Sequence, residues 1–341
     1  MSDLDILKKC RALNDSNDIL YYLIHSRKYD TSAVICAPCN YLFQNNEDQF
    51  FGTCLYVSEN NIREEMRSDF PFRKTQCGIP MIKTTIRKDG VRNVSLDNRQ
   101  IRELPYRYRP DSIPRFHSSF LQSYTCFECA DVIEIIDPRA AMIRLCCEDA
   151  DFRSYVAALG KRFEVSPEQM GLAGSAALGA EKSSDYDIVF YGNAEELRRI
   201  HNTVININQK QGVPQAYGLP LPFRFLFREQ LVDAFYVCED FNRNNLHSAE
   251  MICENVSFRC RVTDDTYALQ MEPFFKVENS DFSYVLLAET FFHATIRKGN
   301  VIEGCGDILC WEHDGKKESV MLCREPFRQL KDYTRYYYQQ E

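Results

Sequence analysis

Short apolar runs, separated by polar or proline-bearing segments, follow one another from about residue 32 to residue 136. The runs "SAVICAP", "FFGTCLYV", "MIKTTI" and "ADVIEII" are rich in β-branched and aromatic residues, which is typical of strands. The segment "LPYRYRPDSIPRF" (104–116) contains three prolines and predicts an extended connection. We therefore expect a strand-dominated region here.

Helical spacing occurs on both sides of this region. In the first 30 residues, Leu4, Leu7 and Cys10 recur at helical intervals, and "NDSND" can cap a second apolar turn, "ILYYLI" (19–24). The stretch 137–163 predicts a further helical segment, opened by Asp137 with Pro138 in its first turn.

The stretch "MGLAGSAALG" (170–179) has the character of a buried strand that runs into a turn and a short helix. Gly174 lets the backbone approach a ligand closely, because it has no Cβ. Ser175, at the start of the helix, offers a hydroxyl and amide donors to an anion. A phosphate group is the expected ligand.

"SDYDIVFYG" (184–192) then predicts a strand in which Asp185 and Asp187, two residues apart, project to the same face. Neighbouring carboxylates repel one another, and Mg²⁺ is a suitable cation for carboxylates beside a phosphate. "PFRFLFREQLVDAFYVCED" resembles a β-hairpin that delivers Asp233 as a third carboxylate, with Glu239 and Asp240 as competitors. The open alternatives are a solvated acidic face for the pair and, for Asp233, an edge-strand charge.

The composition is that of an ordinary globular protein with room for two or three compact units, since 45% of its 341 residues are hydrophobic and 26% charged. The net charge of −8 argues against a protein that mainly holds duplex nucleic acid. A local basic pocket remains open, lined by some of these residues: Arg198 and Arg199, Arg224 and Arg228, Arg297 and Lys298.

The fifteen cysteines do not indicate a disulfide framework, because their number is odd and no secretory signal accompanies them. Two CxxC pairs, Cys36 with Cys39 and Cys126 with Cys129, lie in apolar or aromatic surroundings and far apart in the chain. The pattern favours buried thiols over a zinc site. The acidic N-terminus and the short apolar runs predict a cytoplasmic protein without membrane insertion.

The C-terminal stretch 289–323 reads as strands joined at "KGN", "GCG" and "HDGKK", which predicts a small β domain. Arg297 and Lys298 lie in this stretch. They could reach over the active site, but a position as solvated surface charges is favoured. The tail contains Tyr333, Tyr336, Tyr337 and Tyr338. They form either an aromatic stripe on a last helix or exposed hydroxyls that accept a transferred group.

Gly-Ser, nine residues, Asp-x-Asp and a later lone Asp on a strand together resemble the nucleotidyltransferases of the DNA polymerase β superfamily, over residues 165–240. The resemblance implies an α+β fold. A polymerase β-like core of mixed sheet and helices (146–250) is flanked by a β-rich N-terminal region with leading helices (1–145). A small β-rich domain with the Tyr-rich tail follows (251–341).

The same resemblance implies roles for individual residues. Gly174 and Ser175, with Lys182 and Ser184, would bind the nucleotide. Asp185, Asp187 and Asp233 would be the catalytic residues and would ligate two Mg²⁺ ions, for which Mn²⁺ can substitute. A hydroxyl would then attack the α-phosphate of a nucleoside triphosphate in line, and pyrophosphate would leave.

The whole arrangement is similar to the nucleotidyltransferases of the Hailong antiphage system. This implies a template-independent enzyme that makes short single-stranded oligonucleotides from a nucleotide such as dATP, primed on a protein tyrosine, to control a membrane effector protein. Two alternatives stay open: a protein- or tRNA-modifying nucleotidyltransferase of the antitoxin type, and a non-catalytic nucleotide sensor.

Overall fold

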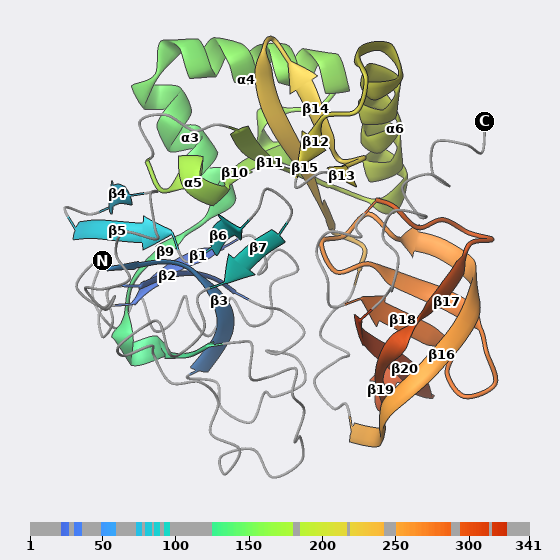
Figure 1. Cartoon of the computed structure of the whole chain (residues 1–341). Helices are drawn as coiled ribbons and strands as arrows, with labels where there is room; N and C mark the ends of the chain where they lie inside the picture. The colour runs from blue at the N-terminus through green and yellow to red at the C-terminus, as the bar shows by residue number, and fades with distance from the viewer. Residues whose placement is uncertain are drawn as a thin grey trace. The chain divides into compact units, whose positions relative to one another are not determined.

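The computed structural model describes residues 22–26, 31–35, 49–58, 73–76, 79–83, 85–88, 92–95, 125–179, 185–216, 219–241, 250–287, 294–313 and 316–325. The chain has an α+β fold, with sheets and few helices among these residues (Figure 1). It forms two compact units, residues 1–141 with 173–183 and residues 142–172 with 184–341.

The first unit contains an antiparallel sheet of seven strands in the order β4-β5-β3-β2-β1-β9, with β8 paired to β3. Its strands are β1 (Leu23–Ser26), β2 (Thr31–Ile35), β3 (Gln49–Ser58), β4 (Arg73–Gln76), β5 (Ile79–Lys83), β8 (Thr125–Glu128) and β9 (Val132–Ile136). The first unit also contains a separate hairpin of β6 (Thr85–Lys88) and β7 (Arg92–Ser95) and the 3-10 turn η6 (Cys129–Asp131). The β-rich N-terminal region is confirmed for these strands.

The helix predicted around residues 19–24 is wrong at its end. Leu23 and Ile24 belong to β1, which pairs with both β2 and β9 and is buried along its whole length. Pairing with strands distant in the sequence outweighs the local helical spacing. Residues 1–21 lie outside the described residues.

The segment 137–163 is helical, as predicted, but it forms two helices, α3 (Pro138–Glu148) and α4 (Ala150–Phe163). Asp137 accepts hydrogen bonds from the backbone amides of Arg139 and Ala140 at 2.7 and 3.3 Å. Asp149 does the same for the first turn of α4, with N···O distances of 2.8 and 2.9 Å. The second cap divides the segment, because a capping aspartate adopts an extended backbone.

A four-stranded sheet in the order β10-β11-β15-β14 follows. Strands β11 and β15 run parallel, and β14 and β15 form an antiparallel hairpin. The elements are η7 (Pro167–Gln169), β10 (Met170–Ala173), α5 (Gly174–Ala177), β11 (Asp185–Gly192), α6 (Ala194–Gln211), β12 (Gln215–Ala216), β13 (Leu219–Pro220), β14 (Arg224–Phe227) and β15 (Gln230–Cys238). The predicted strand at the Asp-x-Asp motif and the predicted hairpin are confirmed.

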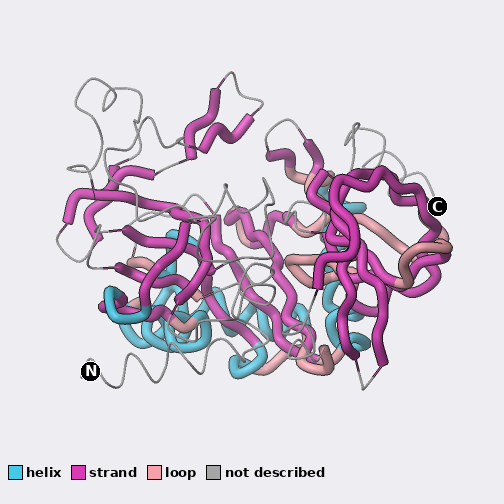
Figure 2. Tube along the Cα trace, turned by 90° about the horizontal axis from the view of Figure 1, so that it is seen from below, coloured by secondary structure: helices cyan, strands magenta, loops and turns pink. Residues whose placement is uncertain are grey.

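Helices α4 and α6 cover one face of this sheet (Figures 1 and 2). From α4, Phe163 packs on Phe190 of β11 and Phe225 of β14, with ring centroids 5.2 and 5.4 Å apart. From α6, His201 meets Tyr236 of β15. The buried positions of both helices recur at three- and four-residue intervals, which is the pattern of an amphipathic helix on a sheet. The opposite face is therefore free of these two helices.

The C-terminal residues form a closed five-stranded barrel in the order β16-β17-β18-β20-β19. Its strands are β16 (Glu250–Tyr267), β17 (Phe274–Glu278), β18 (Tyr284–Leu287), β19 (Val301–His313) and β20 (Lys316–Glu325). The β-rich character predicted for the C-terminal region is confirmed for these strands, but the break at "GCG" is wrong because β19 runs through residues 304–306. The two central residues of the turn predicted at "HDGKK", 314 and 315, lie outside the described residues. The third and fifth strands are parallel; this is the arrangement of an OB-fold barrel.

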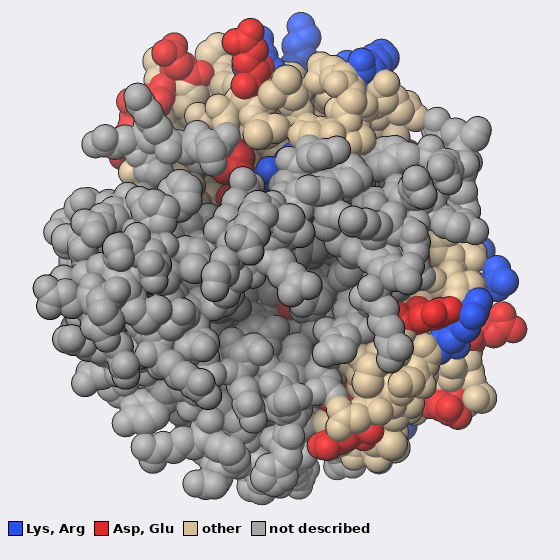
Figure 3. Space-filling view, in the orientation of Figure 1, with Lys and Arg blue, Asp and Glu red and all other residues tan. Residues whose placement is uncertain are grey.

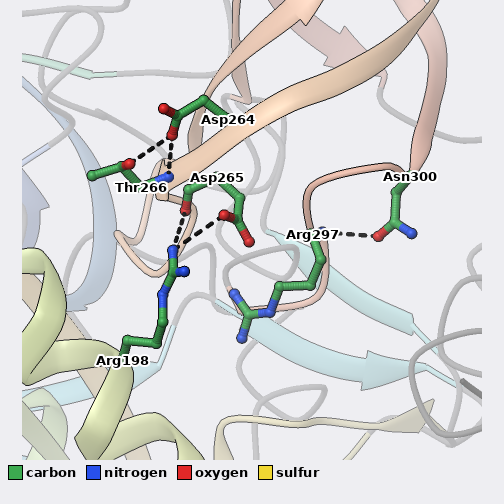
Figure 4. A network of polar contacts seen from close by, with 6 residues as sticks. All are labelled: Arg198, Asp264, Asp265, Thr266, Arg297 and Asn300. Carbon is green, nitrogen blue, oxygen red and sulfur yellow. Dashed lines mark hydrogen bonds and ion pairs between the residues drawn. The ribbon is translucent and has the colours of Figure 1, made fainter. Parts of the chain in front are cut away.

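The barrel is joined to the sheet within the second unit. Arg198 of α6 donates to the carboxylate of Asp265 on β16 at 3.1 Å and to its carbonyl at 3.5 Å (Figure 4). Just after β15, Phe241 packs on Tyr267 and Phe274 at centroid distances of 4.7 and 5.4 Å. This aromatic contact lies on the outer face of β17 and holds the barrel against the end of the sheet.

The turn between β14 and β15 has a strained backbone that yields a stability prediction. Arg228 and Glu229 have φ values of 48° and 66°, a left-handed conformation that costs an L-residue about 1 kcal/mol or more. Glu229→Gly is expected to raise the free energy of unfolding by about 0.5 kcal/mol or more, measured in urea. Glu195→Gly, in the first turn of α6, should instead lower it. Equal effects in the two variants would contradict the strain at Glu229.

Candidate functional site

Asp185 and Asp187 lie at the start of β11, on the sheet face opposite the helices. Tyr186, between them, points the other way and contacts Phe152 and Tyr155 of α4, with ring centroids 5.1 and 5.4 Å apart. Because side chains alternate along a strand, the two carboxylates share the face without helices.

Asp233 reaches the same face from the neighbouring strand. Strand β15 runs parallel to β11, and Asp233 is the register partner of Asp187. Tyr236, three residues further along β15, faces α6. Side chains an odd number of residues apart point to opposite faces of a strand, so Asp233 faces away from the helices. The competitors Glu239 and Asp240 are exposed in the turn after β15.

Arg224 joins two of these carboxylates. It is the antiparallel register partner of Asp233 on β14 and donates to both carboxylate oxygens of Asp233, with N···O distances of 2.5 Å. The same Nη2 donates to Oδ2 of Asp185 at 2.9 Å. Asp185 and Asp233 therefore lie on either side of one guanidinium nitrogen, and bidentate geometry makes the contact with Asp233 the stronger one.

The cluster is screened from solvent to different degrees. The side chains of Arg224 and Asp233 are 11% and 10% exposed, whereas that of Asp185 is 27% exposed. Burial raises the pKa of the Asp233 carboxyl, and the nearby Asp185 carboxylate adds to this, while the hydrogen bonds and charge of Arg224 oppose it. The guanidinium is thus what permits a charged Asp233 at this depth.

The backbone of Arg224 is held independently of its side chain. Nδ2 of Asn208 in α6 donates to the Arg224 carbonyl at 2.9 Å, and the Arg224 amide donates to the Leu221 carbonyl at 3.0 Å. The side chain can therefore change its partners without a shift of β14.

On the helix side, burial raises the pKa of both Tyr155 and Tyr186, and the Asp149 charge adds to the effect on Tyr186. A folded-state pKa above the unfolded value gives stability that is present below pH 10.0 and is lost as the pH rises further. Tyr155→Phe is therefore expected to reduce the loss of unfolding free energy above pH 10, measured in urea titrations at several pH values. Among the described residues the Tyr155 hydroxyl has no hydrogen-bond partner.

The same variant at neutral pH is the control for this effect. Because the buried hydroxyl has no partner in the described part of the chain, Tyr155→Phe should leave stability at pH 7 unchanged or slightly higher. An equally steep alkaline loss in the variant and the unaltered protein would contradict the assignment to Tyr155.

Gly174 and Ser175 follow β10 directly, as the sequence predicts. Gly174 has a φ of 62° and opens the four-residue helix α5, in which Ser175 is half-buried. The positive φ explains why glycine stands here. Lys182, Ser184 and the acceptor candidates lie outside the described residues, the latter being Tyr333, Tyr336, Tyr337 and Tyr338.

Several arginines of the predicted basic clusters are engaged in contacts within the protein. Arg199 donates to the carbonyls of Phe163 and Glu164 at 2.6 and 3.2 Å, and Arg198 and Arg224 have the carboxylate partners given above. Of the CxxC cysteines, Cys129 is buried, and the side chains of the other three lie outside the described residues. On the face seen in Figure 3, described acidic and basic side chains are interspersed.

Carboxylates are the ligand chemistry that Mg²⁺ prefers, and Asp185 and Asp233 already flank a positive charge. The donor set therefore fits a divalent cation in kind. In their present conformations, however, no three His, Cys, Asp or Glu side chains in the described ranges are grouped closely enough to hold one. The guanidinium of Arg224 stands between two of the donors.

Comparison with protein-family models, with curated proteins and with solved structures found no match to this chain. Among the helices of the described residues, none is both long enough and apolar enough to cross a membrane.

Proposed function

We propose that this protein is a divalent-metal-dependent nucleotidyltransferase, which transfers a nucleoside monophosphate from a nucleoside triphosphate to a hydroxyl. The observation that supports it best is the register of β11 and β15. It sets Asp187 beside Asp233 on adjacent parallel strands, and Asp185 reaches Asp233 through Arg224. The three carboxylates lie on the sheet face that α4 and α6 leave uncovered.

In this proposal Asp185, Asp187 and Asp233 hold two Mg²⁺ ions. When bound, these ions neutralise the triphosphate charge and lower the pKa of the attacking hydroxyl. The pairing of β14, β11 and β15 fixes the backbone positions of the three carboxylates, so that only side chains have to rotate when the ions bind. Gly174 and Ser175 are assigned to the triphosphate from the sequence pattern and the positive φ of Gly174.

The sequence resemblance extends the proposal to a polymerase β-like core and to synthesis of short single-stranded oligonucleotides, started on a tail tyrosine and used in antiphage defence. The test is incubation of the full chain with each ribo- and deoxynucleoside triphosphate in Mg²⁺ or Mn²⁺. Pyrophosphate release, product length and tryptic mass spectra are recorded. We expect pyrophosphate release, lengthening products from one preferred nucleotide, and an adduct among residues 333–338.

Other outcomes favour the other hypotheses. A single nucleotide added to a separate protein or tRNA supports the modifying type of nucleotidyltransferase. The non-catalytic sensor is favoured by one specific observation, since Arg224 already neutralises Asp233 and Asp185. It predicts tight nucleotide binding without pyrophosphate release in either metal, and that result would overturn the proposed activity.

A further inference from the structure

Arg224 occupies the position in which positive charge is needed by Asp185 and Asp233. Its Nη2 contacts both carboxylates, and its Nε completes the bidentate pair with Asp233. We propose that Arg224 is an internal counter-ion that competes with divalent cations for this cluster. It holds the carboxylates in place in the absence of metal and gives up its contact with Asp185 when a cation binds. This inference rests on the proposed function.

Two contacts of unequal strength make such an exchange possible. The pair with Asp233 is bidentate and buried, whereas Asp185 receives one hydrogen bond from Arg224 and is the more exposed partner. The weaker, more hydrated contact breaks first. The backbone of β14 need not move, because Asn208 and Leu221 hold the Arg224 main chain. The exchange is therefore a side-chain rotation that leaves Asp233 oriented.

Arg224 also offsets the charge of the neighbouring carboxylates. Without a counter-ion, like charges on Asp185, Asp187 and Asp233 would repel one another. Arg224 is in this sense a positioning residue. It holds Asp233 and Asp185 through its hydrogen bonds and lowers the affinity of the site for the first cation.

Mn²⁺ binding to the purified full chain tests this inference, measured by calorimetry and by the rise in melting temperature with added Mn²⁺. Arg224→Gln is expected to bind Mn²⁺ about tenfold more tightly than the unaltered protein, since one hydrogen bond between charged groups corresponds to roughly one order of magnitude in affinity. Without metal, the melting temperature of Arg224→Gln should be lower than that of the unaltered protein. Added Mn²⁺ should raise it by more than it raises that of the unaltered protein.

Two further variants keep the test decisive. Arg224→Lys retains the charge but cannot bridge two carboxylates bidentately, so it should bind Mn²⁺ with intermediate affinity even if Arg224→Gln folds poorly. Arg162→Gln removes an exposed charge at the end of α4 and should leave Mn²⁺ affinity unchanged.

The outcomes separate this inference from the function on which it rests. Equal or weaker Mn²⁺ binding by both Arg224 variants, together with its loss in Asp187→Asn, would overturn the counter-ion role and leave the metal site standing. If neither the unaltered protein nor any variant binds Mn²⁺, the proposed metal-dependent function itself is wrong.

Discussion

Asp187→Asn is expected to lower the rate of nucleotidyl transfer by about three orders of magnitude, because a lost metal ligand removes several kcal/mol of charge stabilisation in the transition state. Asparagine has the shape of aspartate but no charge, so the packing around β11 should be kept. The measurement is pyrophosphate release at saturating nucleotide and Mg²⁺. Asp185→Asn should behave in the same way, since both side chains share the face without helices.

The control for this prediction is Asp240→Asn. Asp240 is exposed in the turn after β15 and is one of the two alternatives to Asp233, with Glu239, for the third carboxylate, so this variant should retain full activity. Asp187→Asn should unfold at or above the melting temperature of the unaltered protein, because it removes one of three neighbouring negative charges. Activity within tenfold of the unaltered protein in folded Asp187→Asn would show that Asp187 ligates no essential metal.

Arg224→Met is expected to lower the free energy of unfolding by about 3–5 kcal/mol, since it leaves the buried Asp233 carboxylate without its bidentate partner. Urea denaturation at pH 7 measures this effect. The double variant Arg224→Met with Asp233→Val should recover most of the loss, because well-packed apolar pairs replace buried ion pairs at little cost. Asp185 loses its contact with Arg224 in this variant, but its side chain is already 27% exposed to water.

The pH dependence distinguishes a buried charge from lost packing. In Arg224→Met the folded-state pKa of Asp233 should lie further above its unfolded value of 3.8 than it does in the unaltered protein. Stability of that origin is present at low pH and is lost as the pH rises through the folded-state pKa. The variant should therefore be less destabilised at pH 5 than at pH 8. A deficit that is the same at both values would attribute the loss to packing alone.

Several elements of the site were predictable because their signals are local. The apolar run of residues 188–191 and the lone charge in "LVDAFYV" predicted strands where β11 and β15 lie. Gly174 marked a turn that its positive φ confirms. Arg224 was seen only as a member of a basic cluster. Yet a two-residue turn at Arg228 and Glu229, once assigned, sets residue 224 opposite residue 233.

Other features follow only from contacts between distant segments. Leu23 and Ile24 form a strand because β2 and β9 pair with them on both sides. "GCG" continues β19 because β16 and β20 pair with that strand on both sides. Local propensity carries no information about which strands will pair, least of all for β9, whose Ile136 pairs with Leu23.

The sequence by itself determined the acidic pattern of this protein: two carboxylates on one strand face, a third on a later hairpin, and a glycine turn before them. Strand period and turn chemistry are set by neighbouring residues, which is why the pattern is legible there. The tertiary structure alone decided that Asp187 lies beside Asp233 and that Arg224 stands between Asp233 and Asp185. Register between strands, and the charge balance that it creates, arise from packing across the sheet.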